Sequence, residues 1–369
     1  MSAHLNFVPT PLAMAWKGPN QPHEAIAVPH VQLQEGDALV EIEYATICGS
    51  DIHTASGHRS AAAPLILGHE QVGRVVATTP EAALSDGTQL VLGDRVIWSV
   101  IVSCGECVLC VRGVNQKCES LRKYGHEKLG RGWELNGGFA THAHILARTA
   151  VTKVPEQIPA PILAPVSCAT ATAAAALRTA TQLVPMKGNT VVVSGAGMVG
   201  LAIIAMAVAQ GGVVVALDPN AERRKLAMKF GALIALDPLT EQLVPALTQA
   251  GLDVPLISFE ASGAPGAVKS STTMLGIGGV SVLVGSVSPS PDVGIDPEQI
   301  VRKLLSIVGV HNYQTRDLEA AVSFMEDSWN TLPFADLVGP SFPLSELDQA
   351  LAVAKSGADV RVGIHPDPA

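Results

Sequence analysis

Short apolar and β-branched runs, divided by Gly, Pro and Asp, fill residues 30–150. Examples are Ala38–Ile42, Gln71–Ala77 and Asp94–Val100. Runs of this length with turn residues between them are typical of a domain of many short β-strands. We therefore predict an irregular β-rich domain in the first part of the chain.

The pattern changes after a proline-rich stretch at 155–165, where the alanine-rich segment Ala169–Ala180 predicts a helix. Beyond it, strands and helices alternate. The predicted strands are Val191–Val193, Val213–Leu217, Pro255–Phe259, Val280–Val284 and Ile307–Val310, and the predicted helices are Met198–Gln210 and Ala221–Phe230. This alternation predicts an α/β fold with a parallel sheet covered on both faces. The tail from Asp317 contains two helical patterns and a final strand, Val360–Ile364.

One stretch, Met198–Val215, is almost wholly apolar and is long enough to cross a bilayer. However, Gly211-Gly212 interrupts it and Asp218 follows it closely. Glycines and an acid at these positions are typical of a buried helix followed by a turn and a buried strand, so we expect no membrane span. The chain begins Met-Ser-Ala-His-Leu-Asn, without a basic segment and an apolar one, so we expect no signal peptide.

Composition narrows the class of protein. The chain has 369 residues, of which 48% are apolar and 15% charged, and its net charge is −9. The length suits two domains, and the apolar content excludes a disordered chain. The excess of acidic over basic residues argues against nucleic-acid binding, because neutralising phosphates requires clustered Lys and Arg.

A glycine motif lies between a predicted strand and a predicted helix. It reads Gly195-Ala-Gly197-Met198-Val199-Gly200. In such a motif the first glycine allows a tight turn, the second lets backbone approach a pyrophosphate, and the third lets helix pack on strand. The backbone N–H groups that open the helix then bind the phosphates. The motif predicts dinucleotide binding.

Asp218 ends the next apolar strand, where an acid that binds ribose is expected. A carboxylate accepts hydrogen bonds from the two ribose hydroxyls but repels a 2′-phosphate, which favours NAD over NADP. Arg223 and Arg224 leave NADP open, because either side chain could reach a phosphate. Their alternative is a solvated helix face near the adenine.

Four of the six cysteines lie close together, at Cys104, Cys107, Cys110 and Cys118. Four thiolates complete a tetrahedral zinc site and leave no open position, which makes the site a structural one. An iron–sulfur cluster is the rival interpretation, since four cysteines also suit iron. Free thiols in a reducing cytosol are the alternative without a metal.

Three further motifs are dispersed along the chain. They are Cys48-Gly-Ser50-Asp51-Ile-His53, Gly68-His69-Glu70, and Ala164-Pro-Val-Ser-Cys168-Ala-Thr-Ala-Thr172. Two thiolates and one imidazole leave a fourth position open, as in a catalytic zinc site, but spacing alone does not join these segments. Together with the cysteine cluster and the glycine motif, they resemble the zinc-dependent medium-chain alcohol dehydrogenases over essentially the whole chain.

The resemblance implies a GroES-like catalytic domain formed by residues 1–165 and 312–369, with a Rossmann NAD-binding domain at 166–311. It also implies two zinc ions per subunit. The structural ion is held by the cysteine cluster. The catalytic ion is held by Cys48, His69 and Cys168, and acts as a Lewis acid on the substrate oxygen while hydride passes to NAD.

The resemblance also implies roles for five more residues. Ser50 takes the alcohol proton and His53 passes it to solvent, although Ser50 could instead be a plain turn hydroxyl. Glu70 either orients the site or visits the metal. Thr172 and Arg361 contact the cofactor, with Arg361 near the pyrophosphate. The alternative for Arg361 is a solvated surface arginine.

A narrower resemblance concerns Cys118–Glu127 and Leu305–Tyr313, which are similar to alcohol dehydrogenases associated with phosphonate catabolism. It implies a hydroxyalkylphosphonate as substrate, whose charge requires nearby cations. The candidate cations are Arg59, Arg122, Lys123 and His311, and the alternative for each is a solvated surface residue.

Other substrates and functions stay open at this stage. A polyol or a simple primary alcohol is the alternative substrate. The alternative functions are a zinc-free quinone-reductase-like enzyme and a non-catalytic nucleotide-binding protein. We expect a cytoplasmic homo-oligomer, either a dimer or a tetramer, that acts on a small molecule and has no nucleic-acid or membrane partner.

Overall fold

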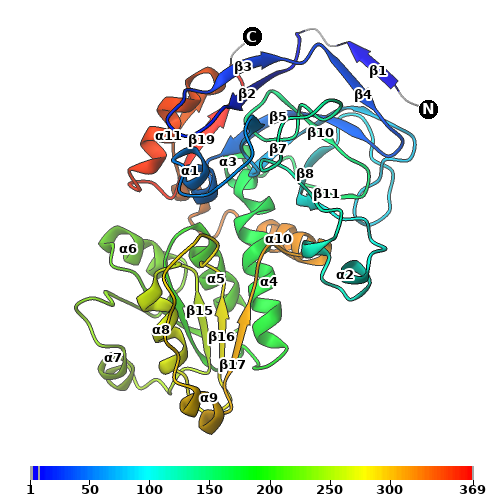
Figure 1. Ribbon diagram of the computed structural model, residues 1–369. Helices are drawn as coiled ribbons and strands as arrows, with labels where there is room; N and C mark the ends of the chain where they lie inside the picture. The colour runs from blue at the N-terminus through cyan, green and yellow to red at the C-terminus, as the bar shows by residue number, and fades with distance from the viewer. Residues whose placement is uncertain (1–2, 7–8, 368–369) are drawn as a thin grey trace. The chain divides into compact units, whose positions relative to one another are not determined.

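The computed structural model describes residues 3–6 and 9–367 (Figure 1). The chain divides into two compact units. The first unit runs to Cys168 and resumes at Gln314–Trp329 and from Phe334 onward, and the second comprises Ala169–Tyr313 and Asn330–Pro333. These division points lie close to residues 165 and 311, where the resemblance places the domain limits.

An eight-stranded sheet forms the centre of the first unit, in the order β11-β8-β7-β5-β19-β18, with β10 added on β5 and β9 on β8. The strands are β5 (Ala38–Thr46), β7 (Gln71–Thr78), β8 (Arg95–Val102), β9 (Arg122–Lys123), β10 (His142–Ile145), β11 (Thr149–Lys153), β18 (Val338–Pro343) and β19 (Arg361–His365). All three runs predicted at 38–42, 71–77 and 94–100 form strands. Because β19 pairs antiparallel with β5, the tail of the chain completes the sheet of the first unit.

Two smaller sheets and several helices complete the described part of the first unit. One sheet contains β2 (Leu12–Trp16), β3 (Glu24–Ala27) and β6 (Leu65–Ile66), and the other contains β1 (Ala3–Asn6) and β4 (His30–Leu33). The helices are α1 (Gly49–Ala55), α2 (Val108–Val111), η1 (Asn115–Lys117), α3 (Ala160–Leu163), η2 (Ala164–Ser167), α10 (Thr315–Ser328), η3 (Phe334–Leu337), η4 (Leu344–Glu346) and α11 (Leu347–Lys355). The core includes Trp98 and Tyr124, whose side chains are fully buried.

The second unit contains a six-stranded parallel sheet in the order β14-β13-β12-β15-β16-β17. The strands are β12 (Thr190–Ser194), β13 (Val213–Leu217), β14 (Ile234–Leu236), β15 (Ile257–Glu260), β16 (Val280–Leu283) and β17 (Ser306–Gly309). The helices are α4 (Ala169–Thr181), α5 (Met198–Ala209), α6 (Ala221–Lys229), α7 (Leu243–Gln249), α8 (Pro265–Thr273) and α9 (Pro297–Lys303). The predicted α/β class and parallel sheet are confirmed.

The apolar stretch Met198–Val215 folds as helix α5, a turn and the start of strand β13, as predicted. Helix α5 packs on β12 and β13, which accounts for its apolar surface. Within the residues that the structure describes, no single helix is both long and apolar enough to span a membrane. One pair of successive helical segments meets those criteria when its lengths are combined, but the chain bends by 49° between the two segments, Ala160–Ser167 and Ala169–Thr181.

Candidate active site and metal centres

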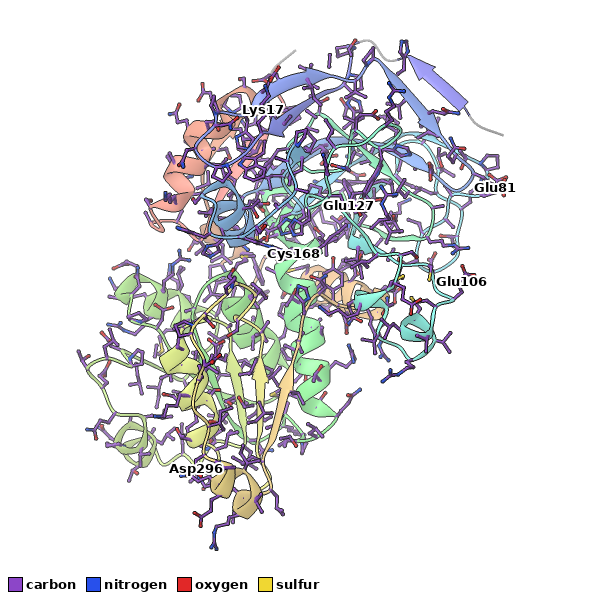
Figure 2. The ribbon with its side chains drawn as sticks, in the orientation of Figure 1. Lys17, Glu81, Glu106, Glu127, Cys168 and Asp296 are labelled. Carbon is purple, nitrogen blue, oxygen red and sulfur yellow. The ribbon has the colours of Figure 1, made fainter. Side chains whose placement is uncertain are left out.

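Three residues from separate parts of the first unit converge on one point. Cys48 follows β5 directly before α1, His69 lies in the loop before β7, and Cys168 follows η2 (labelled in Figure 2). Their Sγ and ring nitrogen atoms all lie within 4.8 Å of one another. Two thiolates and an imidazole at this spacing fit one zinc ion and leave a fourth tetrahedral position for a substrate.

The electrostatics of this group favour ligation. A hydrogen bond from the Cys168 thiol lowers the pKa of Cys48 well below its usual value, although burial opposes the shift. The same bond raises the pKa of Cys168, and burial adds to the rise. One of the two thiols is therefore a ready thiolate, which is the form that binds zinc.

Asp51 positions two of these ligands, a role that the sequence motif did not indicate. Its side chain is fully buried. Oδ2 accepts a hydrogen bond from the backbone N–H of Cys48 at 2.9 Å, and Oδ1 accepts one from Gly68 at 3.2 Å. Oδ1 also lies 3.3 Å from Nδ1 of His69. A carboxylate beside Nδ1 orients the ring so that Nε2 is available to a metal.

The two predicted proton-relay residues lie on helix α1. Ser50 Oγ is 3.4 Å from His69 Nε2, so its hydroxyl lies beside the nitrogen that would bind zinc. His53 follows three residues later, on the same face of the helix, and is exposed. The placement of Ser50 favours the relay over the alternative of a plain turn hydroxyl.

Glu70 and Arg361 form a buried ion pair beside the ligand group. Arg361 Nε donates to Glu70 Oε2 at 2.7 Å, Nη2 donates to Oε1 at 2.8 Å, and Thr46 Oγ1 donates to Oε2 at 2.7 Å. Because Arg361 is only 9% exposed, the alternative of a solvated surface arginine is wrong. Burial raises the pKa of Glu70 to about 7, although Arg361 opposes the shift.

This pair favours an orienting role for Glu70 over direct ligation, because both carboxylate oxygens already accept hydrogen bonds. Arg361 Nη2 also lies 3.8 Å from Cys48 Sγ and can donate to that thiolate. The predicted contact of Arg361 with a pyrophosphate stays a prediction.

The four candidate substrate cations have different surroundings. Arg122 is exposed, donates to Glu127 and lies over the Trp133 ring at 4.4 Å, whereas its neighbour Lys123 is half-buried. Successive side chains of a strand point to opposite faces, which accounts for the difference between them. His311 lies in the second unit and is exposed.

Lys123 interacts electrostatically with two residues of the ligand group, Cys168 and Cys48, and Arg59 interacts with Lys123. Burial, followed by repulsion from Arg59, lowers the pKa of Lys123 to about 8, while Cys168 and Cys48 oppose the shift. Arg59 is half-buried, and its backbone N–H donates to the carbonyl of His53 at 3.0 Å, at the end of α1. Of the four candidates, Lys123 is therefore the one that interacts with the ligand group, and Arg59 is its cationic neighbour.

The cysteine cluster surrounds a second metal-sized space. The sulfur–sulfur distances are 3.5 Å for Cys118–Cys104, 3.9 Å for Cys104–Cys110 and 4.0 Å for Cys107–Cys118. All four cysteines are free rather than disulfide-bonded. A zinc ion with Zn–S bonds of about 2.3 Å requires sulfur atoms about 3.8 Å apart, so the cluster fits one tetrahedral ion.

The glycine motif has the geometry that its sequence predicted. Gly195 has φ +94°, and a Cβ there would meet Ser262 at 2.9 Å. A Cβ on Gly200 would lie 1.8 Å from the Gly195 carbonyl oxygen. A Cβ on Gly197, the N-cap of α5, would meet no atom within 4 Å, which leaves room for a phosphate at the helix N-terminus. Met198 and Val199 are the first two residues of that helix.

The remaining cofactor candidates lie in the second unit. Asp218 follows β13, and its carboxylate accepts backbone hydrogen bonds from Ala196 at 2.7 Å and Asn220 at 2.8 Å. Arg224 donates to the Asp218 carbonyl at 2.8 Å. Arg223 is half-buried on α6, and Thr172 is half-buried in the first turn of α4.

Comparisons with known proteins agree with this geometry. Residues 34–156 match the alcohol dehydrogenase GroES-like domain family, and residues 199–327 match the zinc-binding dehydrogenase family. The chain is 32% identical to a sorbitol dehydrogenase of Halalkalibacterium halodurans, over 89% of this chain and 91% of that protein. It is 29% identical to an L-threonine 3-dehydrogenase of Yersinia pestis, over 92% and 95% of the two chains. An alcohol dehydrogenase structure from Thermotoga maritima superposes with a TM-score of 0.91 and 28% identity, covering 97% of this chain and 100% of that one.

The chain therefore belongs to the zinc-dependent medium-chain alcohol dehydrogenase family. It is an oxidoreductase that acts on a small-molecule substrate. The predicted family and fold class are confirmed, and the non-catalytic alternative is wrong. The match to zinc-binding dehydrogenases disfavours the zinc-free alternative.

Proposed function

We propose that this enzyme oxidises an alcohol that carries an anionic group, in particular a hydroxyalkylphosphonate, with NAD as the hydride acceptor and two zinc ions per subunit. The ligand group of Cys48, His69 and Cys168 supports this most directly, together with Lys123, which interacts with Cys168 and Cys48, and Arg59, which interacts with Lys123. When bound, zinc supplies a Lewis acid for the substrate oxygen and NAD accepts the hydride.

The protein's own residues move the proton. Ser50 Oγ, beside His69 Nε2, is placed to accept a hydrogen bond from the substrate hydroxyl and to take its proton. His53 is exposed one turn further along α1, so its ring can pass the proton to solvent. Asp51, Glu70 and Arg361 hold the surrounding loops in position.

Two local cations suit an anionic substrate. The protein as a whole carries a net charge of −9, so its overall field opposes the approach of an anion. Arg59 offers a planar, bidentate donor for phosphonate oxygens and Lys123 offers a point charge. Because both side chains are half-buried, their charges are less screened than those of exposed residues.

Several observations support the finer parts of the proposal. Asp218 at the end of β13 favours NAD, and Arg224 is already engaged by backbone carbonyls. Free cysteines throughout the chain are typical of a reducing compartment such as the cytoplasm. Exposed Ile277, Val301 and Leu304 near the edge strand β17 suit a homo-oligomer, a dimer or a tetramer.

A polyol is the second candidate substrate. The 32% identity to a protein named sorbitol dehydrogenase favours it. A panel of alcohols compared by kcat/KM at saturating NAD separates the two candidates. The proposal expects 2-hydroxyethylphosphonate to exceed sorbitol and ethanol, and Arg59→Ala to raise KM for the phosphonate about 10-fold while leaving KM for ethanol unchanged. A preference for sorbitol, or an unchanged phosphonate KM in Arg59→Ala, would contradict it.

A further inference from the structure

Glu260 is a buried acid at the end of a strand of the second unit, and neither the predicted nor the proposed chemistry uses it. It is the last residue of β15 and is 0% exposed. Its Oε1 accepts hydrogen bonds from the backbone N–H of Ser262 at 2.8 Å, from the Ser262 hydroxyl at 2.6 Å and from the backbone N–H of Gly263 at 2.8 Å. Three donors exceed the two lone pairs of a neutral carbonyl oxygen, so this pattern favours an ionised carboxylate.

The negative charge of Glu260 has no cationic partner among the residues that the structure describes. The donors to its carboxylate are backbone N–H groups and one hydroxyl. Its second oxygen, Oε2, is buried and has no hydrogen-bond partner in the same part of the chain. A buried charge without a counterion acts on other charges several ångströms away, because protein screens it less than water does.

The loop that Glu260 holds packs against the turn of the glycine motif. A Cβ on Gly195 would meet Ser262 at 2.9 Å. On its other side the loop contacts the turn after β16, since a Cβ on Gly263 would lie 2.7 Å from the Gly285 carbonyl oxygen. The turns that follow β12, β15 and β16 are therefore in contact at the carboxyl edge of the parallel sheet, where such sheets bind their ligands.

The topology of the sheet indicates which half of a dinucleotide lies over this loop. The strand order is β14-β13-β12-β15-β16-β17, so β13 and β15 flank β12 on opposite sides (Figure 1). The turn after β12 carries the glycine motif for the pyrophosphate, and Asp218 after β13 suits the adenine ribose. The nicotinamide half then extends to the other side, across the ends of β15 and β16.

We propose that the carboxylate of Glu260 stabilises the oxidised cofactor selectively, an inference that rests on the proposed use of NAD. The nicotinamide ring carries a positive charge in NAD⁺ and none in NADH. A fixed negative charge at the end of β15 therefore lowers the free energy of bound NAD⁺ relative to bound NADH. Glu260 thus favours oxidation of the alcohol through its charge, without taking a proton or forming a bond.

Glu260→Gln removes this charge, while its amide oxygen can still accept hydrogen bonds from Ser262 and Gly263. We expect the Kd of NAD⁺ to rise about 10-fold and that of NADH to change by less than about 2-fold, as for a unit charge several ångströms away. Ser262→Ala is the matched control, because it removes one hydrogen bond from the loop and keeps the charge. It should change both Kd values by the same factor.

A second variant tests the charge where the fold is not at risk. Ala264 is the exposed N-cap of α8, a position at which Asp is a favoured residue. Ala264→Asp adds a negative charge to the same loop. It should lower the Kd of NAD⁺ about 3-fold and leave that of NADH within about 2-fold.

The measurements are calorimetric titrations of NAD⁺ and NADH into zinc-loaded wild type and the three variants, with near-UV circular dichroism to check the fold. Equal factors for the two cofactors in Glu260→Gln, or in Ala264→Asp if Glu260→Gln does not fold, overturn the role of Glu260. If wild type binds NADP⁺ and NADPH instead, the proposed use of NAD is overturned, and the same ratio for that pair tests Glu260 because the nicotinamide group is the same. Binding of neither pair overturns both proposals.

Discussion

Arg361 in the last strand and Glu70 next to a zinc-ligand residue form a bidentate ion pair, with donor–acceptor distances of 2.7 and 2.8 Å. The tail of the chain thus holds the loop of His69 from within the core. Glu70 is fully buried and Arg361 is 9% exposed, so neither charge has water as a substitute partner. Breaking such a pair on one side leaves a buried charge uncompensated.

Replacing Glu70 by Gln should therefore destabilise the first unit by about 3–5 kcal/mol. Urea unfolding of the zinc-loaded protein measures the change. Glu156→Gln is the matched control, because Glu156 also pairs with an arginine, Arg74, but is exposed. Equal changes in the free energy of unfolding for the two substitutions would contradict the claim that burial makes the pair of Glu70 and Arg361 important for stability.

Asp51→Asn should weaken zinc binding about 10- to 100-fold, because it removes the charge that orients His69. Asn can still accept the hydrogen bond from the backbone N–H of Cys48, so helix α1 should still begin at Gly49. Competition with a fluorescent chelator measures the zinc affinity. The account of Asp51 fails if the variant binds zinc as tightly as Asp86→Asn, an exposed carboxylate in a turn.

The two metal groups should lose their ions independently. Cys104→Ser should reduce the zinc content from two ions per chain to one and lower the Tm, because a structural ion stabilises its fold directly. Cys168→Ser should also leave one ion per chain, and should abolish turnover. Metal analysis after gel filtration gives the stoichiometry. A zinc content of one in wild type, or iron in place of zinc, would contradict the assignment.

Binding of an anionic alcohol should weaken above about pH 8. Burial and Arg59 lower the pKa of Lys123 to about 8, so its ammonium is charged below that pH and loses its charge above it. A hydroxyalkylsulfonate is the suitable probe, because its own charge stays constant across this range. Its KM should rise as the pH passes about 8, and Lys123→Met should show a raised KM without that step. A step that persists in Lys123→Met would assign the titration to another group.

Much of the fold could be predicted from the sequence because long apolar segments carry a strong pattern. Apolar strands such as Val213–Leu217 alternate with helices along the chain, and this alternation predicted the parallel sheet. The glycine motif predicted the turn between the first strand of that sheet and the helix that follows it. Strand β14 and helices α7, α8 and α9 were missed, because they are short and partly exposed, so their apolar periodicity is weak.

The site was predicted in part. Cysteines and histidines at these spacings are rare outside metal sites, so the sequence motifs were enough to predict the zinc ligands. Asp51 had no such signal, because an acid in a first helical turn is also an ordinary helix-capping residue. The burial of Arg361 depends on a pairing between strands far apart in the sequence, and that of Lys123 on which face of β9 it occupies. Neither fact is local to the sequence.

The most direct test of the account is NADH absorbance on mixing zinc-loaded protein, NAD and 2-hydroxyethylphosphonate, before and after removal of zinc with a chelator. The account predicts turnover that is lost on chelation, is restored by zinc and is absent in Cys168→Ser at the same protein concentration. Turnover that persists in the metal-free protein, or undiminished turnover in Cys168→Ser, would contradict the claim that Cys48, His69 and Cys168 form the catalytic zinc site.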